Sequence, residues 1–131
     1  MRVVLDTNIL VSALLKHQSI PGQILNNLLL GEFTLLVDHR ILEEYREVLR
    51  RPKLKIDEVL VDEVMAYIDR FGEFIVAAPL SLKVKDRDDL PFMEVALSGK
   101  ADVLVTGNIK DYAKVPDDLK VVTPNQFLRK I

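Results

Sequence analysis

The sequence opens with Arg2-Val3-Val4-Leu5-Asp6-Thr7-Asn8 and continues with Ile9-Leu10-Val11-Ser12-Ala13-Leu14-Leu15, and this stretch decides the fold. The short apolar run is typical of a strand buried on both faces of a parallel sheet. The polar residues 6–8 suit a turn or a helix start, and the apolar residues 9–15 predict a helix packed back onto the sheet. Because ligands of open α/β sheets bind just past the carboxyl ends of the central strands, Asp6 is the first candidate site residue.

The composition is that of one ordinary globular domain covering residues 1–131. Apolar residues make up 49% and charged residues 29% of the chain, and a chain of this length buries roughly two thirds of its unfolded surface. The absence of cysteine excludes disulfides and thiolate metal sites. The longest uncharged stretch, from His17 to Gly31, is too short to span a membrane, and the charges of Arg2 and Asp6 lead us to expect no secretory segment. We therefore expect a cytoplasmic protein without a membrane segment.

Strands and helices alternate along the rest of the sequence. Further strands are predicted at residues 33–37, 74–77, 103–105 and 121–122. Helices are predicted at 23–30, 91–99 and 124–128. Two longer helices are predicted, one from the cap Asp38 to the terminating Pro52 and one from the cap Asp57 to the terminating Gly72. A surface loop is predicted at 79–88. This order predicts the α/β class, as a three-layer α/β/α sandwich around a central, mainly parallel sheet of four to five strands.

Helical periodicity singles out one acid in the helix that follows Asp38. The buried face of that helix is defined by Ile41, Tyr45, Val48 and Leu49. Glu44 lies three residues after Ile41 and four before Val48, so it flanks this face and is able to lean into a cleft. A salt bridge at the rim, with Arg40 or Lys53, is the structural alternative.

A second acid is selected at the start of the helix at 91–99. Asp89 precedes Met93 by four residues and Ala96 by seven, so it continues the packed face of the helix. An acidic helix start that complements the helix dipole is the alternative explanation. Glu94 lies near the border of the same face, where it either supports a site or is solvated.

The motif Thr106-Gly107-Asn108 follows the apolar strand at 103–105 and therefore opens at the same sheet edge as Asp6. Since Gly and Asn are common turn residues, an ordinary strand-to-loop turn is the alternative. The chain contains no P-loop, no dinucleotide-binding glycine motif and no nucleophile elbow.

The charge of the chain does not by itself indicate nucleic-acid binding, since the net charge is −2 and the pI is near 5.7. Divalent ions bound by gathered acids would offset this charge. Basic residues are concentrated in two groups, namely Arg46, Arg50, Arg51, Lys53 and Lys55, and Lys83, Lys85 and Arg87. Each group forms either a solvated face or a set of phosphate contacts.

Four motifs in order, spread over essentially the whole chain, resemble those of the PIN-domain family. They are Val-Val-Leu-Asp6-Thr-Asn8, Ile-Leu-Glu-Glu44-Tyr-Arg-Glu-Val-Leu-Arg-Arg-Pro, Asp-Arg-Asp-Asp89-Leu-Pro-Phe and Ala101-Asp-Val-Leu-Val-Thr106-Gly-Asn108. This family is the metal-dependent ribonuclease fold used by many bacterial and archaeal toxins of toxin–antitoxin pairs, the VapC-like toxins.

The resemblance implies roles for particular residues. Asp6, Glu44 and Asp89 match the family's catalytic acids, which would bind one or two Mg²⁺ or Mn²⁺ ions. Asn8 and Thr106 match positions that support the site by hydrogen bonding. Asn108 stands where the family often has a fourth acid, although some toxin-like members also carry Thr-Gly-Asn at this motif. Asp111, three residues farther on, is the residue able to take that acid's place.

The resemblance therefore implies a divalent-metal-dependent endoribonuclease that hydrolyses RNA phosphodiester bonds, with a cognate antitoxin as partner and a homodimer or higher oligomer as its assembly. Two alternatives stay open. A PIN-like binding module without catalysis is slightly favoured by Asn108 and the acidic pI but disfavoured by the intact set of Asp6, Glu44 and Asp89. A phosphoryl-transfer domain, such as a receiver or a haloacid-dehalogenase-like phosphatase, is disfavoured because the latter requires a second acid where this chain has Asn8.

Overall fold

A computed structural model describes residues 1–80, 89–112 and 115–131, and the structural statements below concern these residues. Five parallel strands form one sheet in the order β3-β2-β1-β4-β5. The strands are β1 (Arg2–Leu5), β2 (Thr34–Val37), β3 (Glu73–Phe74), β4 (Val103–Val105) and β5 (Val121–Val122). Val3 and Leu5 of β1 pair with Val103 and Val105 of β4, which brings the carboxyl ends of these two central strands together.

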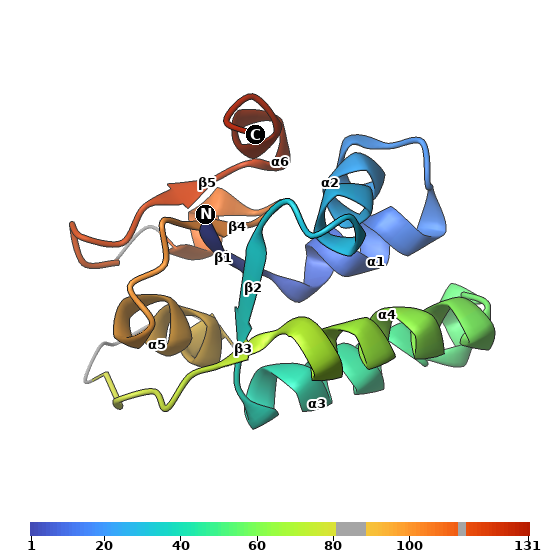
Figure 1. Ribbon diagram of the computed structural model, residues 1–131, viewed down its shortest axis with the longest axis horizontal. Helices are drawn as coiled ribbons and strands as arrows, with labels where there is room; N and C mark the ends of the chain where they lie inside the picture. The colour runs from blue at the N-terminus through green and yellow to red at the C-terminus, as the bar shows by residue number, and fades with distance from the viewer. Residues whose placement is uncertain (81–88, 113–114) are drawn as a thin grey trace.

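Helices cover both faces of this sheet (Figure 1). They are α1 (Thr7–Leu15), α2 (Ile20–Leu29), α3 (His39–Leu49), α4 (Glu58–Phe71), α5 (Leu90–Ser98) and α6 (Pro124–Leu128), with short 3-10 turns η1 (Pro52–Leu54) and η3 (Ile109–Tyr112). α5 packs against β1, β2 and β4, whereas α1 packs against α2 and α3. The predicted α/β/α architecture is confirmed, and the sheet is wholly parallel.

Two predicted boundaries are wrong by a few residues. α2 begins at Ile20, so Pro21 and Gly22 lie in its first turn rather than in a break before it. Proline is tolerated there because the first backbone N–H groups of a helix have no partner within the helix, and the Ser19 hydroxyl caps the turn by accepting from the Gly22 N–H at 3.1 Å.

The predicted strand at 74–77 is shorter than expected. β3 covers only Glu73–Phe74, and its pairing ends where the Ile75 N–H donates to the Val37 carbonyl at 2.9 Å. Beyond that point the backbone N–H groups of Ala78 and Leu80 donate to side chains of α5 instead of to a neighbouring strand. Residues 81–88, which include most of the predicted loop at 79–88 and the basic residues Lys83, Lys85 and Arg87, lie outside the described part of the chain.

The core lies between the sheet and its helices and holds one buried polar contact that bears on the site. Tyr45 is completely buried, and its hydroxyl donates to the Leu5 carbonyl at 2.6 Å, directly before Asp6. Phe33, directly before β2, and Phe127 of α6 meet edge to face with ring centroids 5.3 Å apart. No helix in the described residues is both long and apolar enough to cross a membrane.

Candidate active site

Asp6 lies at the carboxyl end of β1, in the N-cap position of α1, and is only 7% exposed. Its side chain makes no capping hydrogen bond to the helix. Instead, Oδ2 accepts from the Thr106 hydroxyl at 2.8 Å, from the Tyr112 hydroxyl at 3.2 Å and from the Asn8 amide at 3.4 Å. Neutral donors therefore hold the carboxylate in place without cancelling its charge.

The residues after β4 close over Asp6 from the neighbouring strand. Thr106 is fully buried, and its hydroxyl accepts from the Asn108 N–H at 3.1 Å while it donates to Asp6. The Asn8 side chain accepts from the Gly107 N–H at 3.1 Å, which ties the start of α1 to this turn. The Asn108 side chain is exposed and donates to the Asp111 carboxylate at 2.9 Å. The structure thus brings Asn8 and Thr106 to Asp6 and directs the Asn108 amide to Asp111.

Glu44 reaches toward the same sheet edge from the first half of α3. It is half-buried, and one of its oxygens accepts a hydrogen bond from the Thr7 hydroxyl in the first turn of α1. Arg40, considered above as a salt-bridge partner for Glu44, pairs with Asp38 and Glu94. Thr7 follows Asp6 directly in the chain, so this hydrogen bond joins the Glu44 carboxylate to the residue next to Asp6.

Asp89 occupies the N-cap position of α5 and is 8% exposed, but its side chain also makes no capping hydrogen bond. Other helices of this chain use their N-cap side chains, since Asp38 accepts from the Ile41 N–H at 3.0 Å and Asp57 from the Val59 N–H at 2.9 Å. Burying a carboxylate is costly and capping is the usual compensation at this position. Two buried aspartates that do not cap their helices therefore differ from ordinary helix-start acids.

The electrostatics of Tyr112 show that the three acids share one neighbourhood. Burial raises the pKa of the Tyr112 hydroxyl well above its ordinary value, and the charges of Asp6, Asp89 and Glu44 all raise this pKa further. Burial likewise raises the pKa of Asp6, an effect that the Thr106 and Tyr112 hydroxyls offset in part and that the charge of Asp111 increases. The site is a region of concentrated negative charge at the carboxyl edge of the sheet.

Sequence reasoning missed three residues that contact the site. Tyr112 and Thr7 donate to Asp6 and Glu44, and Tyr45, which was assigned only to a buried helix face, also holds the end of β1. A buried tyrosine requires a hydrogen-bond partner for its hydroxyl. The sequence offers no signal that identifies that partner, because the contacts join residues 106, 37 and 40 positions apart.

The donor set suits a hard divalent cation. Carboxylate oxygens are the ligands that Mg²⁺ and Mn²⁺ prefer, and Mg²⁺ is commonly held by one or two carboxylates while several waters complete its shell. Within residues 1–80, 89–112 and 115–131, no three acidic or histidine side chains converge closely enough to hold one ion by themselves. Carboxylates of this kind therefore suit an ion that takes few protein ligands and completes its shell with water.

The raised pKa of Asp6 predicts how the stability of the metal-free protein depends on pH. An acid whose folded-state pKa lies above its ordinary value of 3.8 binds its proton more tightly in the folded state. Its stabilising contribution is present below the unfolded-state pKa and is lost as pH rises through the folded-state pKa. We expect urea unfolding with chelator to show Asp6→Asn gaining stability relative to wild type as pH rises from about 4, by at most about 1.4 kcal/mol per pH unit. A difference that stays constant over the series would contradict the raised pKa.

Comparisons with known proteins identify the family of this chain. A family model for the PIN domain matches residues 2–110. The chain is 29% identical over 142 aligned residues to the uncharacterized protein MJ1680 of Methanocaldococcus jannaschii, with 98% of this chain and 90% of that protein covered. The crystal structure of VapBC2 from Rickettsia felis bound to a DNA fragment from their promoter has a similar fold, with a TM-score of 0.62, 23% identity and coverage of 94% of this chain and 98% of the other. This chain belongs to the PIN-domain family, whose members are generally nucleases.

Proposed function

We propose that this protein is a divalent-metal-dependent endoribonuclease and the toxin of a toxin–antitoxin pair. The observation that carries the proposal is the pair of buried aspartates, Asp6 and Asp89, at the N-caps of α1 and α5. Neither caps its helix, and both belong to the charged neighbourhood of Tyr112 together with Glu44. An acidic site of this kind is suited to hydrolysing a phosphodiester bond with a bound cation.

Each acid has a distinct part in the proposed reaction. Asp6 and Asp89 would hold the ion, with Asp6 oriented by the Thr106 and Tyr112 hydroxyls. When bound, Mg²⁺ or Mn²⁺ supplies a lowered pKa for the attacking water and neutralises charge on the phosphate oxygens. Glu44, oriented by Thr7, positions the attacking water or binds a second ion. Asn8 and Thr106 act by fixing the loop after β4 against Asp6.

Asn108 stands at the position of the family's fourth acid and is hydrogen-bonded to Asp111. The Asn108 amide donates to Asp111, and the charge of Asp111 acts on Asp6. We propose that Asp111, held by Asn108, supplies the negative charge that an aspartate at 108 would otherwise provide. Asn108 then supports the site and is not itself a ligand.

Three arginines of the first basic group are paired with surface acids. Arg46, Arg50 and Arg51 pair with Asp69, Asp62 and Glu47 at 3.2, 2.7 and 2.8 Å on the outer surface of α3 and α4. These ion pairs favour a solvated face over phosphate contacts for the first basic group. Bound cations at the acidic site are therefore the main attraction that this proposal offers to an RNA phosphate.

Protein partners are proposed on separate grounds. The similar structure from Rickettsia felis is a VapBC2 complex, which supports a cognate antitoxin as a partner of this chain. Phe71 at the end of α4, Phe74 in the edge strand β3 and Val76 just after it are 58%, 44% and 98% exposed. Exposed apolar side chains at and beside a sheet edge support a protein contact, with the antitoxin or with a second copy in a homodimer or higher oligomer.

The test is cleavage of a mixed pool of transfer RNA, ribosomal RNA and short single-stranded RNA, with a matched DNA pool beside it. Reactions contain Mg²⁺, Mn²⁺ or chelator, and Asp6→Asn and Asp89→Asn variants accompany the wild type. We expect discrete RNA products that require metal and both aspartates. Products that persist in both variants would contradict the assigned site, and metal binding without any cleavage would favour a non-catalytic PIN-like module.

A further inference from the structure

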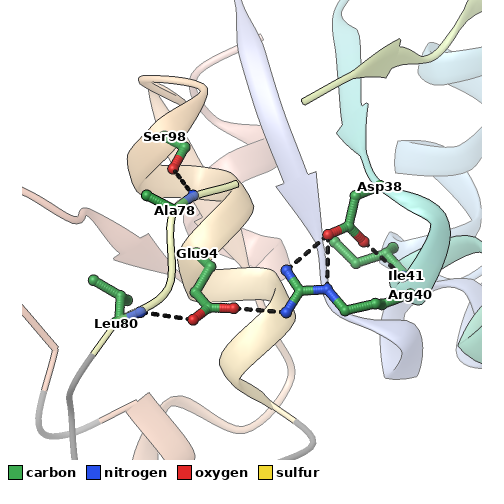
Figure 2. Close-up of polar contacts among 7 residues, drawn as sticks. All are labelled: Asp38, Arg40, Ile41, Ala78, Leu80, Glu94 and Ser98. Carbon is green, nitrogen blue, oxygen red and sulfur yellow. Dashed lines mark hydrogen bonds and ion pairs between the residues drawn. The ribbon is translucent and has the colours of Figure 1, made fainter. Parts of the chain in front are cut away.

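A chain of polar contacts outside the acidic site links α3 to α5 (Figure 2). The Arg40 guanidinium donates to Asp38 at 2.9 Å and to Glu94 at 2.6 Å, and Asp38 in turn accepts from the Ile41 N–H at 3.0 Å. The other oxygen of Glu94 accepts from the Leu80 N–H at 2.7 Å. Arg40 and Glu94 therefore connect the cap of α3, the middle of α5 and the segment that leads toward Asp89.

Glu94 is the member of this network whose position is most constrained. It is only 6% exposed, although it carries a charge and belongs to a helix whose other faces pack against the sheet. A buried carboxylate is retained at a cost unless both of its oxygens are bonded and its charge is paired. Here one oxygen faces Arg40 and the other faces a backbone N–H, so both requirements are met.

The ion pair between Arg40 and Glu94 lies on the same two helices as Glu44 and Asp89. Arg40 precedes Glu44 by four residues on α3, about 6 Å along the helix axis. Glu94 follows Asp89 by five residues on α5, about 7.5 Å along its axis. The ion pair thus joins the same two helices that carry Glu44 and Asp89, roughly one turn away from each.

A second hydrogen bond joins the segment after β3 to α5. The Ser98 hydroxyl accepts from the Ala78 N–H at 2.9 Å, so the segment after β3 is bonded to α5 at both Ser98 and Glu94 (Figure 2). These two bonds replace the strand pairing that ends at Ile75. They fix α5 to the segment that precedes residues 81–88.

We infer that Glu94 and Arg40 are positioning residues that set the separation of Asp89 and Glu44 and thereby the affinity of the site for its divalent cation. The inference rests on the proposed function, because it assigns to a described ion pair the alignment of the acids proposed to bind metal. Groups that orient metal ligands typically change metal affinity or activity by about 10–100-fold when they are removed. Neither residue is assigned contact with the ion or with RNA.

The experiment measures Mn²⁺ binding directly, by electron paramagnetic resonance of free Mn²⁺, for wild type, Glu94→Gln and Arg40→Gln. We expect the Kd for Mn²⁺ to rise by about 10–100-fold in both variants. The Mn²⁺ concentration needed for half-maximal RNA cleavage should rise in parallel, while saturating Mn²⁺ restores most of kcat. Glu94→Asp, which keeps the charge, should recover part of the affinity.

Matched controls separate alignment of the acids from general stability. Arg50→Gln and Asp62→Asn each remove one partner of the exposed Arg50–Asp62 pair, which also has a 2.7 Å contact but joins the C-cap of α3 to α4 and involves neither α1 nor α5. We expect both controls to bind Mn²⁺ as wild type does. If either single variant does not fold, the double variant Arg40→Gln/Glu94→Gln decides the question, because it removes both charges of the pair and leaves no unpaired carboxylate at position 94 beside the 47% exposed Arg40 position.

The outcomes distinguish this inference from the nuclease proposal. An unchanged Kd for Mn²⁺ in folded Glu94→Gln and Arg40→Gln overturns the inference, even where their melting temperatures fall, and leaves the nuclease intact. Mn²⁺ binding that weakens in the variants of a protein that cleaves no RNA supports the inference and overturns the nuclease. A wild type that binds no Mn²⁺ overturns both.

Discussion

The Asp6→Asn variant is expected to lose metal-dependent RNA cleavage by about three orders of magnitude or more while its metal-free fold stays at least as stable as that of wild type. Loss of a metal ligand removes several kcal/mol of stabilisation from the transition state, and about 4 kcal/mol corresponds to a thousandfold rate. The fold is spared because a neutral Asn oxygen accepts from Thr106 and Tyr112 as the carboxylate does. Burial also raises the pKa of Asp6, so the ionised group is destabilising in the absence of a cation.

A matched control for this variant is Asp57→Ala, because Asp57 is an aspartate that does cap its helix. Loss of the cap costs about 1 kcal/mol, so its melting temperature should fall by roughly 3–5 °C while cleavage is retained. The measurements are initial rates of RNA cleavage and thermal unfolding with chelator for the two variants and wild type. An Asp6→Asn protein that melts much earlier than wild type and still cleaves RNA would make Asp6 a structural residue.

Mn²⁺ is expected to raise the melting temperature of wild type by roughly 10 °C when it is present at about a hundred times its Kd. A ligand that binds only the folded state stabilises it by about 2.7 kcal/mol at that concentration, and a domain of this size gains a few degrees per kcal/mol. The cation also removes repulsion among Asp6, Asp89 and Glu44, whose charges act together on Tyr112. Differential scanning fluorimetry over a Mn²⁺ series gives the shift.

The Asp89→Asn variant should lose most of this Mn²⁺-dependent shift, because Asp89 is one of the two buried aspartates assigned to the ion. Asp62→Asn, which removes one exposed acid of α4, should keep it. A rise in melting temperature that is equal in Asp89→Asn and wild type would place the bound ion elsewhere on the protein. An equal rise in all three proteins with Ca²⁺ or simple salt would indicate screening of surface charge instead of a site.

The sequence by itself determined the fold. Short apolar runs at 3–5, 35–37 and 103–105 are typical of strands buried on both faces, and these alternate with helices whose caps, such as Asp38 and Asp57, are local features. It predicted β3 too long because the end of a strand depends on which groups accept its N–H donors. Here those acceptors are Ser98 and Glu94, about 20 and 14 residues farther along the chain.

For the candidate site, periodicity and strand ends sufficed to select Asp6, Glu44 and Asp89, since both signals are local. What only the tertiary structure decided is how these carboxylates are held: Asp6 by Thr106 and Tyr112, Glu44 by Thr7, and the helices α3 and α5 by Arg40 and Glu94. Each of these contacts joins residues at least 37 positions apart. Local propensity carries no information about such pairs, because their partners are set by the crossing of helices over a parallel sheet and by the need to satisfy every buried charge.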